Sequence, residues 1–194
     1  MAELEFDARD RRTRLGMKGP RAAEWLVAQG LGVPMAPNSW ARSTGAAGSG
    51  PVLVARLGQS EFFLEDAPAG TTLRAIAPAL AAHPPGVYPV LREDAAFELS
   101  GAGVHDVLAQ VCNVNFAGLA LDSRPVIMTL MIGVAVLVVP ESMHEGPRAE
   151  RRYRFWCDPT FGPFLCETLA VVVAECGGIG AGSNEAARHA PKHR

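Results

Sequence analysis

Three side chains of this sequence, Ser60, Cys157 and Cys166, are candidates for nucleophilic catalysis. Such a nucleophile needs a base within hydrogen-bond reach and a third group that orients the base. No motif in the sequence supplies this geometry, and Cys166 lies in an apolar segment where a core position is expected. Cys157 is the most open case, because Arg154 and Asp158 stand close to it in the chain. We therefore predict no catalytic residue.

The segment around Cys157, RRYRFWCD at residues 151–158, alternates like a strand with one face turned away from the core. Arg152, Arg154 and Trp156 share this face. Arginine and tryptophan are enriched among the anchors of protein interfaces. One interpretation of the segment is therefore a docking surface.

The residues that follow this strand favour a structural interpretation. Asp158 stands where its side chain would cap a helix that begins at Pro159, with Thr160 in the first turn. The segment would then be a capped corner between a strand and a helix. Both interpretations stay open at this stage.

Composition argues against several classes of function. Lysine and arginine number 18, and aspartate and glutamate 20, so no net positive charge attracts nucleic acid or an anionic membrane. The apolar run at 125–140 is shorter than the roughly 20 residues of a membrane-spanning helix, and its β-branched residues predict two buried strands around Gly133. Four cysteines without CxxC spacing, and no signal-peptide pattern at the N-terminus, favour reduced thiols in the cytoplasm.

Metal and phosphate sites are not predicted. The five histidines are scattered, and no pair has ligand spacing with a cysteine or a carboxylate. The glycine runs at 45–50 and 177–182 do not join a strand to a helix, which is the context in which backbone N–H groups hold a phosphate. We interpret them as a linker and a tail.

Local patterns divide the chain into helices and strands. Residues 19–32 predict a helix with glycines at its end, and residues 33–51 a long connection. Residues 52–66 predict a hairpin, and residues 71–83 a helix capped by Thr71.

The second half of the chain repeats this order. A strand ends at Gly19 and at Gly101, an offset of 101 − 19 = 82 residues, and a leucine follows seven residues later, at Leu26 and Leu108. The pair of strands in IMTLMIGVAVLVV is matched to VLVARLGQSEFFL. The repeat predicts a pseudo-symmetric α+β fold made of duplicated β-α-β-β-α units. The predicted domain covers residues 15–176, with halves of about 15–84 and 85–176, a partly ordered arm at 1–14 and a disordered tail at 177–194.

Four blocks, in this order and spacing over about residues 14–175, carry a resemblance to a known family. They are RLGMKGPRAAEWLVAQGLGVPMAPNSW, ARLGQSEFFLED, VYPVLREDAAFELSGAGVHDVLAQVCNVN and YRFWCDPTFGPFLCETL. Together they resemble the gamma subunit of heterotetrameric sarcosine oxidase and the small subunit of N-methylglutamate dehydrogenase. The resemblance implies a folate-binding-domain-like fold, as in aminomethyltransferases.

The resemblance also implies a function. Complexes of this family oxidatively demethylate N-methyl amino acids such as sarcosine, carry FAD, FMN, NAD and zinc, and pass the one-carbon unit to tetrahydrofolate. Partners would be larger alpha and beta flavoprotein subunits and a small zinc-binding delta subunit. The gamma-type chain is non-catalytic, so no catalytic residue is carried over. The residues expected to maintain the fold or contact partners are Arg152, Arg154, Trp156, Asp158, Thr160 and Gly162.

Two other hypotheses stay open. A freestanding folate-binding, aminomethyltransferase-like protein would need a carboxylate for the pterin, for which Asp94, Glu98 and Asp158 are available. A small-molecule-binding regulatory module outside any complex is the third. No cofactor-binding residue is predicted.

Overall fold

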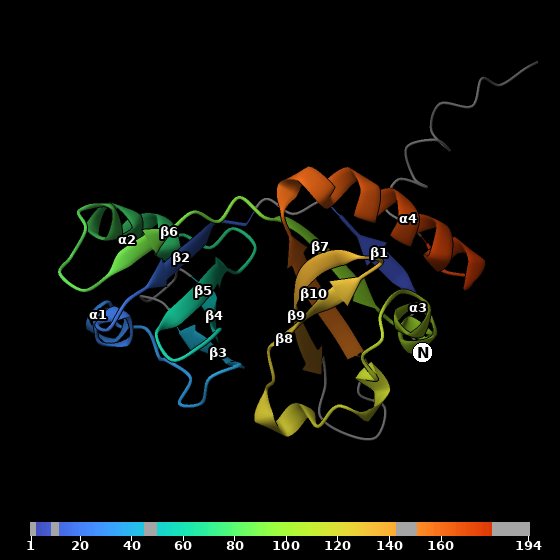
Figure 1. The fold of residues 1–194 in the computed structure, drawn as a ribbon, viewed down its shortest axis with the longest axis horizontal. Helices are drawn as coiled ribbons and strands as arrows, with labels where there is room; N and C mark the ends of the chain where they lie inside the picture. The colour runs from blue at the N-terminus through green and yellow to red at the C-terminus, as the bar shows by residue number, and fades with distance from the viewer. Residues whose placement is uncertain (1–2, 9–11, 45–49, 143–150, 180–194) are drawn as a thin grey trace, which may run out of the picture. The chain divides into compact units, whose positions relative to one another are not determined.

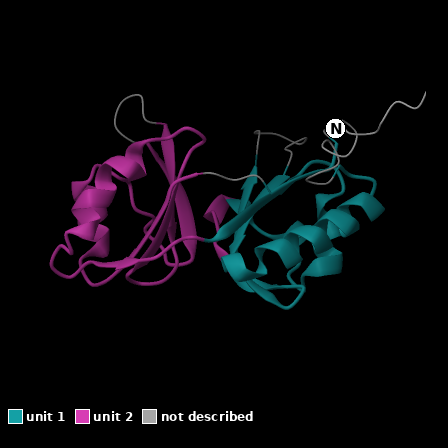
Figure 2. Ribbon diagram, turned by 90° about the horizontal axis from the view of Figure 1, so that it is seen from above, with its two compact units in different colours: residues 1–10, 94–121, 128–194 teal, residues 11–93, 122–127 magenta. Residues whose placement is uncertain are grey.

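The chain folds into two compact units. The computed structural model describes residues 3–8, 12–44, 50–142 and 151–179 (Figure 1). Unit 1 comprises Met1–Asp10, Asp94–Leu121 and Met128–Arg194, and unit 2 comprises Arg11–Glu93 and Asp122–Ile127 (Figure 2). Within the described residues, each unit has a five-stranded antiparallel sheet and two α-helices.

Unit 2 contains a sheet of strand order β3-β4-β5-β2-β6. Its elements are β2 (Arg14–Lys18), α1 (Ala22–Ala28), β3 (Ser39–Thr44), β4 (Pro51–Arg56), β5 (Glu61–Asp66), α2 (Thr72–Ala81) and β6 (Tyr88–Val90). The predicted hairpin is confirmed, because β4 and β5 pair antiparallel on either side of Leu57–Ser60. The core joins side chains of both helices to the sheet, among them Met17, Leu26, Val54, Leu64 and Leu73.

Unit 1 contains a sheet of strand order β1-β7-β10-β9-β8. Its elements are β1 (Glu5–Asp7), β7 (Ala95–Ser100), α3 (Val104–Val111), β8 (Ile127–Met131), β9 (Val134–Ser142), β10 (Arg151–Cys157) and α4 (Gly162–Glu175), with short 3₁₀ turns at Phe116–Gly118 and Pro159–Phe161. A third 3₁₀ turn, Leu121–Ser123, begins at the last residue of one unit 1 segment and continues into unit 2. β8 and β9 confirm that the apolar run forms two strands. No helix among the described residues is long and apolar enough to cross a membrane.

The two sheets have the same order of strand pairing. From one edge they run β3-β4-β5-β2-β6 and β8-β9-β10-β7-β1. By position β4 therefore matches β9 and β5 matches β10, so the predicted match of 127–139 to 52–64 is wrong by one strand. The predicted match aligns Gly58 with Gly133. Both glycines lie in turns between strands, but Gly58 lies between β4 and β5, whereas Gly133 lies between β8 and β9.

Each unit has five strands where the predicted β-α-β-β-α order has three. In unit 2 the additional strands are β6, at one edge of the sheet, and β3, which lies inside the stretch 33–51 that was predicted to be a connection. β3 pairs with β4 over six residues, but of its side chains only Ser43 is buried. A strand that buries few apolar side chains leaves no alternating apolar pattern in the sequence. The linker predicted at 45–50 lies outside the described residues except for Gly50.

Residues of the predicted arm and of the predicted tail form hydrogen bonds with each other in unit 1. β1 pairs with β7 and buries Phe6, so a strand forms within the stretch predicted as a partly ordered arm. Ile179, in the predicted tail, donates its N–H to the carbonyl of Leu4 at 2.9 Å and accepts from the N–H of Phe6 at 3.1 Å. Residues 180–194 of that tail lie outside the described residues.

Gly19 and Gly101, the glycines that marked the repeat, follow β2 and β7 and both have positive φ angles, +133° and +92°. A Cβ on Gly19 would lie 2.3 Å from the carbonyl oxygen of Gly86, and one on Gly101 would lie 2.0 Å from that of Glu3. Real Cβ atoms do not come so close to a backbone oxygen. The strand ends therefore need glycine for both conformation and space.

Gly101→Ala should lower the free energy of unfolding by roughly 2–3 kcal/mol, because it adds this overlap to the strain of a positive φ. Gly30→Ala is the matched control: its φ is +79°, yet its Cβ would meet nothing within 4 Å. This control should cost only about 1 kcal/mol. Urea denaturation of both variants tests the difference, and equal effects would contradict it.

The cap of α2 differs from the prediction. Thr71 makes no side-chain cap hydrogen bond. Instead the buried carboxylate of Asp66, the last residue of β5, accepts from the N–H of Leu73 at 3.2–3.3 Å. Desolvation by burial raises the pKa of Asp66 above its ordinary 3.8, outweighing the lowering by the Leu73 N–H and by Arg74.

Asp66→Asn should therefore change how stability depends on pH. The folded state binds the Asp66 proton more tightly than the unfolded state, so the contribution of Asp66 to stability falls as pH rises from 3.8 through the raised pKa. An asparagine oxygen can still accept from Leu73. Denaturation midpoints across this window should therefore shift in favour of the variant as pH rises. A constant difference at all pH values would contradict this expectation.

Candidate functional site

The strand-to-helix corner centres on β10, which lies between β7 and β9. Tyr153 and Phe155, on one face, are fully buried, and Phe155 stacks on Phe97 with ring centroids 5.4 Å apart. Tyr153 meets Phe116 edge-on at 5.4 Å. This face packs into unit 1 as the alternation predicted.

The opposite face of β10 carries a buried ionic network. Arg154 donates to Glu98 at 3.0 Å, and Arg152 lies between Glu98, at 3.3 Å, and Glu141, at 3.1 Å. The guanidinium of Arg154 also lies 5.3 Å from the ring centroid of Trp156. Two carboxylates from β7 and β9 thus neutralise two arginines of β10.

Burial corrects one expectation about this face. Arg154 is 2% exposed and Trp156 is 1% exposed, so the prediction that their face turns away from the core is wrong for these two residues. An arginine can be buried where a carboxylate and an aromatic ring meet its charge, and the sequence of β10 alone does not reveal these partners. Arg152 is half-buried. A role of these residues in contacts with partners stays a prediction.

Asp158 forms the predicted cap. Its carboxylate accepts from the backbone N–H of Thr160 at 2.9 Å and from the Thr160 hydroxyl at 2.6 Å. These hydrogen bonds lower the pKa of the Asp158 carboxyl, which is exposed and therefore ionised at neutral pH. At Gly162, where α4 begins, a Cβ would lie 2.9 Å from the Cβ of Ala95, so the helix approaches β7 too closely for a larger residue.

Cys157 lies at the buried end of β10. Desolvation by burial raises the pKa of its thiol to about 11, and the negative charges of Asp158 and Asp94 add to the rise. Burial also raises the pKa of the Cys166 thiol, and the negative charge of Glu167 raises it further. The nucleophilic form of cysteine is the thiolate, which this environment disfavours.

Cys157 should therefore resist alkylation in the folded chain. Iodoacetamide at about pH 8 should leave Cys157 unmodified while it labels the half-buried Cys176, and both thiols should react in urea. Mass spectrometry of the labelled peptides tests this expectation. Rapid labelling of Cys157 in the folded state would reopen a nucleophilic role.

A histidine–tyrosine pair was not found from the sequence. His105 of α3 and Tyr153 of β10 are 48 residues apart in the chain, but their Nε2 and hydroxyl lie 2.7 Å apart. Burial, and then the charge of Arg151, lower the pKa of His105, and burial raises the pKa of Tyr153. Both groups are therefore neutral at pH 7. The pair ties α3 to the sheet, and no local sequence pattern could have indicated it.

The three carboxylates considered for folate have other surroundings. Glu98 binds Arg152 and Arg154, and Asp158 binds Thr160. The charges of Asp94 and Asp158 both raise the pKa of Cys157, whereas Glu98 lies opposite Arg154, three residues before Cys157 in β10. The corner thus does not gather the three carboxylates. No group of histidine, cysteine and carboxylate side chains in the described ranges could hold a metal ion.

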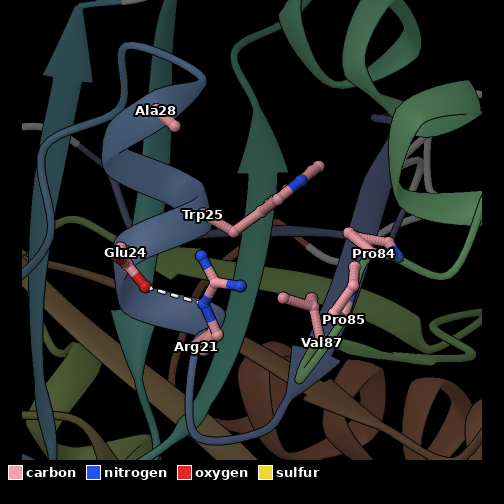
Figure 3. Close-up of a pocket in the computed structure, with 7 residues that line it drawn as sticks. All are labelled: Arg21, Glu24, Trp25, Ala28, Pro84, Pro85 and Val87. Carbon is pink, nitrogen blue, oxygen red and sulfur yellow. Dashed lines mark hydrogen bonds and ion pairs between the residues drawn. The ribbon is translucent and has the colours of Figure 1, made fainter.

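A shallow groove in unit 2 is a second candidate site (Figure 3). It has a volume of about 240 Å³ and lies between α1 and the segment that precedes β6. Trp25 reaches from α1 toward Pro84, and Arg21 pairs with Glu24 at 2.9 Å. The lining residues are Arg21, Glu24, Trp25, Ala28, Pro84, Pro85 and Val87. The groove can accept a small apolar group, and its lining includes no cysteine, serine or histidine.

Comparison with known proteins shows a shared fold. No family model and no curated protein matches the sequence. A chain of the heterotetrameric sarcosine oxidase from Corynebacterium sp. U-96, in complex with pyrrole 2-carboxylate, is similar with a TM-score of 0.64 and 20% identity over 92% of this chain and 87% of that chain. The glycine cleavage system aminomethyltransferase T from Bartonella henselae is similar with a TM-score of 0.60 and 17% identity over 87% of this chain. This chain spans only 46% of the aminomethyltransferase. The two sheets and four α-helices that the described residues form thus have an aminomethyltransferase-like fold.

Proposed function

We propose that this chain is the gamma-type structural subunit of a sarcosine-oxidase-like complex. The observation that carries the proposal is the extent of the fold match. The alignment takes in 92% of this chain and 87% of a chain in the sarcosine oxidase, so the two chains have similar lengths. The same fold fills less than half of the aminomethyltransferase. The match thus takes in most of a chain of the first protein and less than half of the second.

The surroundings of the candidate residues support a non-catalytic role. The thiol of Cys157 is held protonated, Asp158 caps the corner, and Glu98 pairs with Arg152 and Arg154. Each group is already engaged in maintaining unit 1. Catalysis by the complex would then be performed by its other subunits.

A duplicated, pseudo-symmetric origin of the fold belongs to the same proposal. The common strand order of the two sheets supports it, as do the two glycines that follow the corresponding strands β2 and β7. Each repeat would then be a β-α-β-β-β-α unit with one further edge strand.

In the proposed complex, alpha and beta flavoprotein subunits and a zinc-binding delta subunit surround this chain in the cytoplasm. The complex removes a methyl group oxidatively from an N-methyl amino acid, sarcosine or N-methylglutamate, and transfers the one-carbon unit to tetrahydrofolate. FAD, FMN, NAD and zinc belong to the complex and not to this chain.

Purification of the tagged chain from its native cells tests the proposal. Larger chains should elute with it, and the eluate should show flavin absorbance and oxidise sarcosine or N-methylglutamate. A solitary, colourless chain would contradict the proposal.

The second candidate is a freestanding folate-binding protein, which the fold match to an aminomethyltransferase favours. Calorimetry of the isolated chain with a reduced folate separates the two functions. Heat of binding at ligand concentrations up to ~1 mM would favour the second candidate, and no heat would remove it.

A further inference from the structure

The outward side of α4 exposes large apolar side chains beside two glutamates. The helix turns Leu165, Leu169 and Val173 into unit 1, where all three are fully buried. On the other side Phe164 and Val171 are 49% and 58% exposed, and Phe161, just before the helix, is 51% exposed. We call Phe161, Phe164 and Val171 the α4 face. A helix on the surface of a protein normally has polar residues on its outer side, so three large exposed apolar side chains there are unusual.

A helix that packs on a sheet does not need large apolar residues on its outer side, as α2 and α3 show. α3 packs beside α4, yet it turns Asp106, Ala109 and Gln110 outward. α2 covers the sheet of unit 2 and exposes Arg74 and small alanines. Exposed apolar patches of this kind mark interaction sites. The α4 face is therefore a property of this helix and not of the fold.

The charged residues of α3 and α4 are all negative. α3 and α4 contain Asp106, Glu167 and Glu175 and no lysine or arginine. The ionised carboxylate of Asp158 lies at the N-terminal end of α4. In a two-fold dimer the same patch meets itself, which would bring these carboxylates toward one another. Like charges opposed across an interface are unfavourable, so a second copy of this chain does not fit.

We propose that the α4 face docks a different protein chain, whose surface is apolar and edged by lysine or arginine. Apolar contact supplies the affinity, and the cations at the edge pair with Glu167 and Glu175. This inference rests on the proposed function for the identity of the partner, which is one of the larger flavoprotein subunits of the complex.

Two valines on helices provide a matched test. Val171 on α4 is 58% exposed and Val27 on α1 is 61% exposed. The full-length tagged chain is co-expressed with the larger flavoprotein subunits of its own source, and the amount of co-eluted subunit is measured. Val171→Glu should reduce it about tenfold or more, since it places a charge in an apolar contact, whereas Val27→Glu should not change it.

Two further variants separate docking from folding and charge from packing. Phe164→Ala truncates an exposed ring and adds no charge, so circular dichroism should be unchanged while co-elution falls. Glu167→Lys should also reduce co-elution, because it places a cation against the basic edge of the partner. Added salt should weaken co-elution of the wild-type chain, where it screens an attraction, and strengthen that of the variant, where it screens a repulsion.

The outcomes distinguish this inference from the proposed function. If the wild-type chain brings down a larger subunit without flavin and Val171→Glu abolishes this, the docking surface stands and the proposed function fails. If the complex is yellow and active and Val171→Glu and Phe164→Ala leave it intact, or if Val27→Glu disrupts it equally, the docking inference is overturned. A wild-type chain that runs alone, as a monomer or as a dimer that Val171→Glu splits, overturns it too.

Discussion

Trp156→Ala is expected to lower the free energy of unfolding by about 3–5 kcal/mol, the usual cost of removing a large buried aromatic side chain. Trp156 is 1% exposed and is the largest fully buried side chain of the chain's described part. It lies in the central strand of its sheet, opposite Ala96 of β7 and Leu137 of β9. Ala96 is too small to fill the space left by the indole, and Leu137 is held in its own strand, so a cavity would remain.

The control for this prediction is Trp25→Ala. Trp25 is only half-buried beside the groove of unit 2, so its truncation should cost about 1–2 kcal/mol. Urea denaturation followed by circular dichroism measures both variants. The result also separates the two interpretations of β10. A Trp156→Ala chain that keeps its stability but loses its partners would favour a docking surface, and a chain that unfolds would favour the core.

Features set by neighbouring residues could be predicted from the sequence. The Asp158 cap depends on three residues in succession, and the hairpin of β4 and β5 on two short apolar runs around a glycine. Helices α1 and α2 follow from apolar segments with glycine or proline at their ends. Such signals are local, so one sequence is enough to find them.

Features that depend on distant pairing could not be predicted. Glu98, the partner of Arg154, comes 56 residues earlier in the chain, and the Glu65 partner of Arg14 comes 51 residues later. Without these partners, alternation in β10 marked Arg154 as outward-facing. β3 was missed for a related reason, because its pairing with β4 leaves no apolar pattern. The cap of α2 by Asp66 likewise crosses seven residues.

Arg154→Met is expected to destabilise the chain by about 3 kcal/mol, although it keeps most of the volume of the side chain. The guanidinium is almost fully buried, with its side chain 3% exposed, and it donates to Glu98 at 3.0 Å. Its removal takes away one of the two arginines that contact Glu98, and the other, Arg152, is also bound by Glu141. A partly buried carboxylate would then lack one of its two cations, and that loss exceeds the gain from a more apolar side chain.

A double-mutant cycle tests whether the pair acts as a unit. Glu98→Gln alone should also be destabilising, because it removes the carboxylate that both Arg152 and Arg154 contact. The double variant Arg154→Met/Glu98→Gln removes both charges, so its loss should be smaller than the sum of the two single losses, by about 1–3 kcal/mol. Strictly additive losses would show that the two residues stabilise β10 independently. The coupling expected instead would identify the ionic network as what allows two arginines to occupy the middle of this sheet.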